Sequence, residues 1–122
     1  MTQGVHILMN DIKNMWDFPV KEGVSFKNAN RVHPLMQIRV EKLIRHLCKD
    51  CNVKRAVLFG SSLDFRCCSS SDIDLYIEKY EKEKKLLPLP DIDCEVDLIT
   101  GLSPDSALYD EIDKTGLVLF ER

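Results

Sequence analysis

The sequence has no long apolar run: no stretch approaches the roughly 20 consecutive apolar residues that cross a membrane. Its first residues, Met-Thr-Gln-Gly-Val-His, also lack the basic segment and the apolar segment of a secretory signal. The hydrophobic fraction of 44% is ordinary for a globular protein. We therefore expect a cytoplasmic protein that does not contact membranes.

The chain also lacks an excess of basic charge. Its 17 lysines and arginines are outnumbered by 20 acidic residues, so the formal net charge is -3 at pH 7. Broad electrostatic binding of nucleic acid needs a basic surface, so nucleic acid is not an expected partner. A polyanionic substrate would need a divalent cation to supply the missing positive charge.

Cysteine and histidine are too scattered to predict a disulfide framework or a metal cluster. The five cysteines are an odd number in a chain expected to be cytoplasmic, so we expect reduced thiols. Cys48 and Cys51 have the spacing of half a zinc site or of a redox pair, but no second pair matches them. Cys67 and Cys68 are expected in a loop, where an exposed thiol can be oxidised.

With 122 residues, the chain is long enough for one domain with a real core. We expect a single domain over residues 1–122, with an N-terminal extension at 1–33 and the core at 34–122. This length leaves no room for a separate substrate domain. A second substrate must therefore be bound by this domain or by a partner.

The N-terminal extension has a weaker pattern than the core. Apolar residues at roughly helical spacing from Val5 to Trp16 indicate a helix. The Gly and Asn residues of 20–33 then indicate a loop, with a short strand near 24–26.

In the core, helical and strand patterns follow one another. Pro34 suits the first turn of a helix, and the apolar repeat that follows predicts this helix over 34–49. Apolar runs and alternating patterns predict four strands, at 53–59, 72–78, 92–99 and 117–120. A second helix is predicted from a cap at Ser103 to Gly116, and 79–90 is expected to be an exposed connection. We expect an α/β (α+β) fold, in which a small mixed β-sheet is flanked by helices.

A small-residue turn and two carboxylates stand out within this pattern. Gly60 and Ser61 end the strand over 53–59, where backbone amides and the serine hydroxyl can bind a phosphate. Asp72 and Asp74 occupy alternate positions of the next strand, so they share a face with Cα atoms about 6.5 Å apart. Two such carboxylates can bind one divalent cation, and hard oxygen ligands suit Mg²⁺.

A third carboxylate is expected on a neighbouring strand. Asp97 can complete a second metal site or take the proton from an attacking hydroxyl. Asp93 and Glu95 lie on the same predicted face, but Asp97 is favoured because Val-Asp-Leu-Ile embeds it in the strand. A phosphate-binding turn with nearby carboxylates indicates metal-dependent phosphoryl or nucleotidyl transfer. The alternative is that Asp72 and Asp74 form a solvent-facing strand edge without a function.

These segments carry a resemblance to a known family. With Leu-Phe-Gly-Ser, Ser-Asp-Ile-Asp-Leu and Val-Asp-Leu-Ile in this order, the sequence resembles the polymerase-beta-like nucleotidyltransferase superfamily. In size it is similar to the minimal nucleotidyltransferase branch, and the resemblance spans roughly residues 36–121. It implies that Gly60 and Ser61 open a helix that cradles the nucleotide phosphates. It also implies that Asp72 and Asp74 bind Mg²⁺, with Asp97 as the third carboxylate.

Two positions depart from the pattern of the small family members. These commonly carry an arginine just after the glycine-serine pair and a glycine a few residues later, where this chain has Ser62 and Phe65. Arg66 can replace some of the lost positive charge. We predict that Ser62 and Ser71 contact the nucleotide along with the glycine-serine pair.

The resemblance implies transfer of a nucleoside monophosphate, with AMP from ATP favoured, to a hydroxyl acceptor, with Mg²⁺ as cofactor. The acceptor is a partner protein, as when an antitoxin of this branch adenylylates its all-helical toxin, or a small molecule such as an aminoglycoside. The shortness of the chain favours the partner protein, because the drug-modifying enzymes add a helical domain. A further alternative is a nucleotide-binding or interaction module of the same fold with little or no catalysis.

Overall fold

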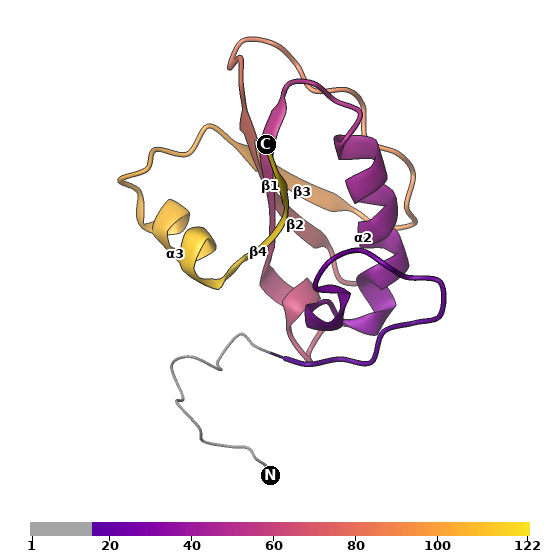
Figure 1. Cartoon of the computed structure of the whole chain (residues 1–122). Helices are drawn as coiled ribbons and strands as arrows, with labels where there is room; N and C mark the ends of the chain where they lie inside the picture. Colours follow the sequence, from indigo (N-terminus) through magenta and orange to yellow (C-terminus); the bar gives the residue numbers. More distant parts are fainter. Residues whose placement is uncertain (1–15) are drawn as a thin grey trace.

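The computed structural model describes residues 16–122. The helix predicted from Val5 to Trp16 therefore lies outside the described residues, except for Trp16 itself. Two α-helices, two 3₁₀ helices (η) and four strands follow one another in the described part of the chain (Figure 1): η1 (Ala29–Arg31), α2 (Pro34–Leu47), β1 (Val53–Phe59), η2 (Gly60–Leu63), β2 (Ile73–Lys79), β3 (Val96–Thr100), α3 (Ala107–Thr115) and β4 (Leu117–Glu121).

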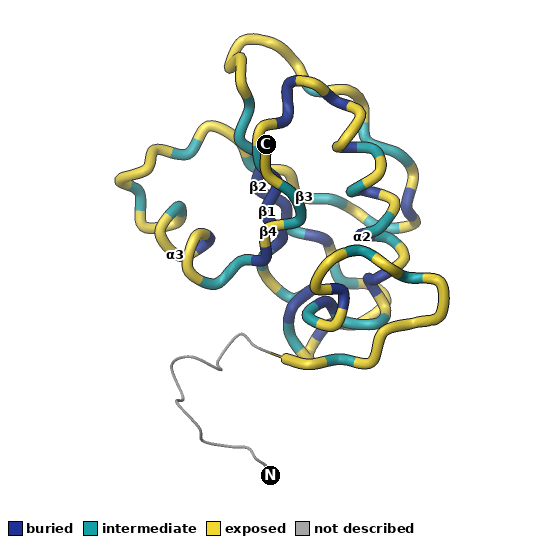
Figure 2. The backbone as a smooth tube through the Cα atoms, in the orientation of Figure 1, coloured by how far each residue is buried: buried dark blue, intermediate teal, exposed yellow. Residues whose placement is uncertain are grey.

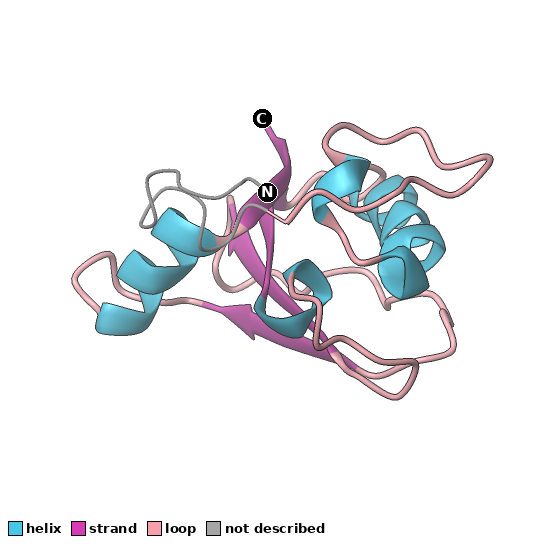
Figure 3. Cartoon of the chain, turned by 90° about the horizontal axis from the view of Figure 1, so that it is seen from below, coloured by secondary structure: helices cyan, strands magenta, loops and turns pink. Residues whose placement is uncertain are grey.

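The four strands form one mixed sheet in the order β3-β2-β1-β4. β1 pairs antiparallel with β2 and β4, whereas β2 and β3 run parallel. Helices α2 and α3 lie on opposite faces of the sheet, as Figure 3 shows. The expected α+β fold, with a small mixed sheet flanked by helices, is confirmed. Within residues 16–122, none of the helices has the length and apolarity needed to cross a lipid bilayer.

Helix α2 buries its apolar stripe against one face of the sheet. Met36, Val40 and Leu43 are fully buried and cluster with Leu58 of β1 and Ile73 of β2. The buried stretches of β1 and β2 are drawn dark blue in Figure 2. The helix ends two residues before its predicted end at 49, because the backbone there closes into a turn. Repeating apolar residues at helical spacing are what this packing requires.

Helix α3 begins later than predicted. Its N-cap is Ser106, whose Oγ accepts a hydrogen bond from Tyr109 N at 3.1 Å, so the predicted cap at Ser103 is wrong. A turn closed by Ser106 N and Ser103 O at 3.0 Å precedes the helix and delays the first helical hydrogen bonds. Ile112 of α3 packs on Val57 and Tyr76 of the sheet. Tyr76 is therefore buried, although it lies at alternate positions with Asp74 on the same face of β2.

The strand predicted at 92–99 is shorter in the structure. β3 begins at Val96, because its partner β2 begins at Ile73 and these two residues form the first pair. Asp93 adopts a φ of 66°, which interrupts an extended backbone. Asp93 therefore lies outside β3. The short strand predicted near 24–26 is also wrong, since these residues form no strand.

Residues 16–33, which we call the N-terminal arm, are fastened to α2 by a buried amide. Gln37 is fully buried, and its Oε1 accepts a hydrogen bond from Lys21 N at 2.8 Å. Its Nε2 donates to Pro19 O and to Val32 O, both at 2.9 Å. These bonds satisfy a side chain that would be costly to bury alone, and they fix the course of the arm over the helix.

The connection at 79–90 is mostly exposed, as predicted, and begins with the last residue of β2. Two buried polar side chains at the start of β1 hold it. Asn52 Nδ2 donates to Lys84 O at 2.9 Å, and Asp50 Oδ2 accepts from Leu87 N at 2.8 Å. The connection therefore has a fixed path although it lacks regular structure.

Candidate active site

Gly60 occupies a position that only glycine can fill. It ends β1 with a φ of 80°, in the left-handed region that residues with a Cβ rarely adopt. A Cβ at this position would also collide with Asp74 Oδ2 of the neighbouring strand. The residue before Gly60, Phe59, pairs with Asp74 in the sheet. The predicted phosphate turn and one predicted metal ligand therefore meet at a single point.

Asp74 and Asp97 are paired positions of the parallel strands β2 and β3. Paired residues project from the same face, so both carboxylates lie on the face that carries α3. Asp74 is half-buried and Asp97 exposed. Desolvation raises the pKa of Asp74, and the carboxylates of Asp97 and Asp72 raise it further. The structure thus brings the three predicted carboxylates within electrostatic reach of one another.

The turn after β1 is shorter than the helix that the resemblance implied. Gly60–Leu63 form one turn of 3₁₀ helix, and the next residue, Asp64, is already extended. Ser61 is half-buried, whereas Ser62 is fully buried and its backbone oxygen accepts a hydrogen bond from His33 N at 2.8 Å. Among the residues that the structure describes, the Ser62 hydroxyl has no hydrogen-bond partner. Its burial does not fit the prediction that this side chain contacts the nucleotide.

A cleft of about 760 Å³ lies between this turn and helix α3. It is lined on one side by residues of the turn and the following loop and on the other by residues of α3: Phe59, Gly60, Ser61, Leu63, Asp64, Arg66, Asp110, Glu111, Ile112, Lys114 and Thr115. Lys114 is a candidate phosphate contact that sequence reasoning missed, and its place on a helix far along the chain gave no signal. The cleft makes Gly60 and Ser61 accessible to a ligand.

Both basic side chains of the cleft already have a carboxylate partner. Arg66 Nη2 lies 2.6 Å from Asp64 Oδ2, and Lys114 Nζ lies 2.9 Å from Asp110 Oδ2. A phosphate that enters the cleft must compete with these two carboxylates. Because Arg66 and Lys114 are solvent-exposed, separating the two pairs costs little.

Residues 41–122 match the protein family described as Polymerase beta, Nucleotidyltransferase. The chain belongs to this family. The match covers β1 through β4 and begins within α2, so the turn, the three aspartates and the cleft all lie inside it. Neither the curated proteins nor the solved structures gave a match to this chain.

The carboxylates of this nucleotidyltransferase domain are of the ligand type that a divalent cation such as Mg²⁺ prefers. Mg²⁺ prefers oxygen ligands and is commonly held by one or two carboxylates together with substrate phosphates. A cation here would relieve the repulsion that raises the pKa of Asp74. Within residues 16–122, no three His, Cys, Asp or Glu side chains are already arranged to hold a metal ion. The carboxylates would therefore supply only part of the ligand shell of the ion, and water or substrate phosphates the rest.

Asp72 borders a second hollow of the domain, together with Asp93 and Glu95, the two less favoured alternatives to Asp97. This shallow acidic hollow of about 420 Å³ is lined by Asp72, Asp93 and Glu95, among others. Asp93 and Glu95 both precede β3, whereas Asp97 lies within it and opposite Asp74. The structure therefore separates Asp97 from its two competitors by their place in the sheet.

The predicted nucleotide contact Ser71 is occupied with its own loop. Its Oγ accepts a hydrogen bond from Cys68 N at 3.0 Å and lies 3.5 Å from Cys68 Sγ. Hydrogen bonds from Ser70 and Ser71 lower the pKa of the exposed Cys68 thiol to about 7. All five cysteines are free, as expected, so Cys48 and Cys51 form no disulfide.

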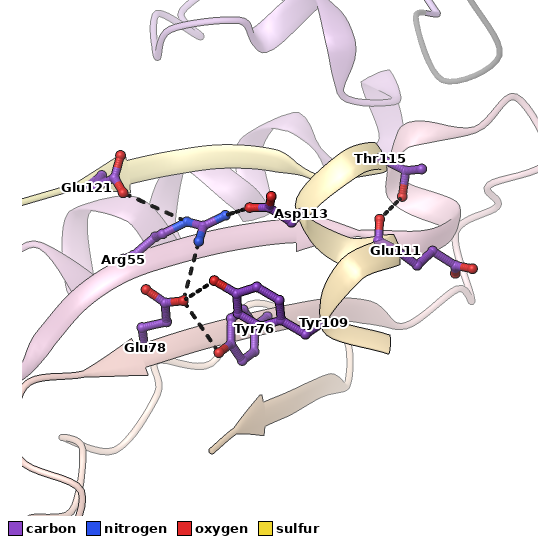
Figure 4. A network of polar contacts seen from close by, with 8 residues as sticks. All are labelled: Arg55, Tyr76, Glu78, Tyr109, Glu111, Asp113, Thr115 and Glu121. Atoms are coloured by element: carbon purple, nitrogen blue, oxygen red, sulfur yellow. Dashed lines mark hydrogen bonds and ion pairs between the residues drawn. The ribbon is translucent and has the colours of Figure 1, made fainter. Parts of the chain in front are cut away.

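A partly buried ion network fixes α3, and with it one wall of the cleft, to the sheet (Figure 4). Arg55 of β1 lies 2.7 Å from Asp113 of α3 and 3.3 Å from Glu78 of β2. Tyr76 and Tyr109 donate hydrogen bonds to Glu78 Oε2 at 3.5 and 3.4 Å. Glu121 of β4 lies 3.9 Å from Arg55 Nε, so the charged group of Arg55 has partners on two strands and a helix. Sequence reasoning missed this network, because its members come from four separate segments.

Proposed function

We propose that this nucleotidyltransferase domain transfers a nucleoside monophosphate, AMP from ATP being favoured, to a hydroxyl acceptor in the presence of Mg²⁺. One observation carries the proposal: Gly60 lies against Asp74, and Asp74 is paired with Asp97. A phosphate held at the glycine turn would lie beside two carboxylates on neighbouring strands. This is the juxtaposition that metal-assisted transfer of a phosphorus group requires.

In this reaction, separate groups of residues would bind the phosphates, hold the cation and accept the proton. The backbone amides after Gly60 and the Ser61 hydroxyl bind phosphate oxygens, and Arg66 and Lys114 add positive charge once they leave their carboxylate partners. Asp72, Asp74 and Asp97 would hold Mg²⁺, which would supply positive charge next to the phosphates. Asp97 is exposed, so it can also accept the proton of the acceptor hydroxyl.

The proposed acceptor is a hydroxyl on a partner protein in the cytoplasm, of the helical toxin type that the resemblance implies. The position of Asp97 supports a large acceptor, because β3 is the edge strand of the sheet and both Asp97 and Leu98 are exposed. A bulky partner can approach such an edge. A small molecule such as an aminoglycoside is the second candidate acceptor.

A weakly catalytic nucleotide-binding module is the competing proposal, and specific observations favour it. The turn at Gly60 is a single 3₁₀ turn, Ser62 is buried, and the cleft cations Arg66 and Lys114 are paired with carboxylates. Each of these weakens the phosphate side of the site. The aspartates on the metal side are the reason that transfer is preferred.

Pyrophosphate release from ATP separates the two proposals. With Mg²⁺ and the product of a neighbouring gene as acceptor, the wild-type protein should release pyrophosphate and leave a radioactive label from [α-³²P]ATP on the acceptor. Asp74→Asn should lower this rate by about 100-fold or more, because the carboxylate beside the phosphates is lost. Asp105→Asn, an exposed aspartate before α3, is the matched control and should leave the rate unchanged. Nucleotide binding without release, for every nucleotide and acceptor tried, would instead establish the binding module.

A further inference from the structure

Two aromatic side chains from distant parts of the sequence meet on the surface. Trp16 of the N-terminal arm and Phe65 of the loop after η2 have ring centroids 4.9 Å apart, with planes at 54°. Trp16 is 40% exposed and Phe65 59% exposed. Two large rings in contact and still open to solvent leave apolar surface that a ligand can cover.

Two further rings, those of Phe18 and His33, continue the row of contacts that begins with Trp16 and Phe65. Phe18 stacks on Trp16 at 6.4 Å and contacts the His33 ring at 5.2 Å. The backbone of the arm is fixed at both ends of this row, since Phe18 N donates to Asn30 O at 2.6 Å and His33 N to Ser62 O at 2.8 Å. The second bond attaches the arm directly to the turn after Gly60. The exposed rings therefore hold a set position relative to that turn.

Phe65 does not itself line the cleft, but it lies between two residues that do. The residues on either side of it, Asp64 and Arg66, both line the cleft together with Gly60 and Ser61. Residues of a 3₁₀ turn rise by only about 2 Å each, so the backbone of Phe65 lies at most about 14 Å from that of Gly60. A ligand whose phosphates sit at Gly60 can thus extend toward the two rings.

We infer that Trp16 and Phe65 form a stacking platform for the nucleobase of the nucleoside triphosphate. The inference rests on the proposed function, because it places the base of the same substrate. An aromatic ring binds any base through its π face, and stacking needs no charge. The cations of the cleft, Arg66 and Lys114, must leave their carboxylate partners before they contact a phosphate. Stacking would add affinity that does not depend on this exchange of partners.

Trp16 is the single tryptophan of the chain, so its fluorescence reports on the platform directly. The experiment titrates the full-length protein with Mg²⁺-ATP and, separately, with Mg²⁺ and inorganic triphosphate, which has no base. ATP should quench Trp16 emission and bind about tenfold or more tightly than triphosphate. Triphosphate should leave the emission unchanged while competing with ATP for the phosphate subsite.

Phe65→Ala tests the second ring while the reporter stays in place. This variant should weaken ATP binding by about tenfold and leave the affinity for triphosphate unchanged. Tyr80→Ala removes an aromatic ring that is 53% exposed in the connection after β2, and it should bind ATP like the wild type. Circular dichroism of both variants checks that the fold is kept.

The outcomes separate the inference from the function on which it rests. Equal affinities for ATP and triphosphate, with no effect of Phe65→Ala, would overturn the stacking platform and leave the proposed phosphate and metal site standing. If neither ligand bound the wild-type protein in the presence of Mg²⁺, the proposed function would fail and the platform with it.

Discussion

At the scale of single residues, Gly60 connects the fold with the proposed chemistry. Gly60→Ala puts a Cβ against Asp74 Oδ2 on a backbone with a φ of 80°. The left-handed conformation alone costs a non-glycine residue roughly 1–2 kcal/mol. We predict that Gly60→Ala lowers the free energy of unfolding by about 2–4 kcal/mol in urea denaturation and abolishes triphosphate binding.

Gly101→Ala is the matched control for this variant. Gly101 has a similar φ of 73°, but a Cβ built on it meets nothing within 4 Å. It should therefore show the backbone cost alone, about 1 kcal/mol, and bind triphosphate normally. Equal destabilisation of the two variants would show that the contact of Gly60 with Asp74 has no energetic weight.

The residue types of the candidate site followed from the sequence, but several of their contacts did not. A glycine at the end of a buried strand and aspartates at alternate positions have a readable pattern. The burial of Ser62 has none, because it depends on a hydrogen bond from His33, far upstream in the sequence. The same holds for the contact of Phe65 with Trp16. Tertiary neighbours, not local pattern, decide which way such side chains turn.

At the scale of elements, the start of α3 separates a sequence pattern from the capping contact itself. Ser106 Oγ accepts the hydrogen bond of Tyr109 N, whereas Ser103 Oγ accepts one from Asp105 N at 3.3 Å in the preceding turn. We predict that Ser106→Ala lowers the free energy of unfolding by about 1 kcal/mol. Ser103→Ala should cost less than half as much, although the sequence favoured it as the cap.

The two serines form their own controls, because both changes remove one exposed or half-exposed hydroxyl. Thermal unfolding followed by circular dichroism measures both variants, and a larger loss of stability for Ser103→Ala would move the start of the helix back to the predicted position.

The sequence pattern predicted the bounds of α2 well and those of β3 poorly. α2 has its own apolar repeat, whereas the first residue of β3 is set by where β2 begins.

At the scale of the whole molecule, the sheet order decides where the chemistry can occur. β2 lies between β1 and β3, so Asp74 is flanked by the end of β1 on one side and by Asp97 on the other. The sequence predicted a mixed sheet flanked by helices, and this is confirmed. The strand order was beyond local patterns, because it depends on long-range pairing. The Arg55 network, which joins three strands to α3, was beyond them for the same reason.

The crowding of carboxylates at this junction makes stability depend on charge and on cations. The pKa of Asp74 in the folded protein lies above its ordinary value of 3.8, chiefly through desolvation and then through Asp97 and Asp72. The folded state therefore binds this proton more tightly than the unfolded state. The stabilisation from protonated Asp74 is fully present below about pH 3.8 and is lost as the pH rises through the folded-state pKa. At pH 7 the ionised Asp74 carboxylate therefore lowers the free energy of unfolding.

We predict that Asp74→Asn, which removes that charge, unfolds at a higher temperature than the wild type at pH 7 without Mg²⁺. The difference in unfolding temperature between the two proteins should narrow as the pH falls toward 3.8, because Asp74 of the wild type then takes up its proton. Mg²⁺ at ten times its Kd should stabilise the wild type by about 1.4 kcal/mol, or roughly 5 °C, and leave Asp74→Asn unchanged. NaCl at equal ionic strength controls for screening, and Asp105→Asn should respond to Mg²⁺ like the wild type. An equal response of Asp74→Asn and the wild type to Mg²⁺ would remove Asp74 from the proposed metal site, because the stabilisation would then come from binding elsewhere.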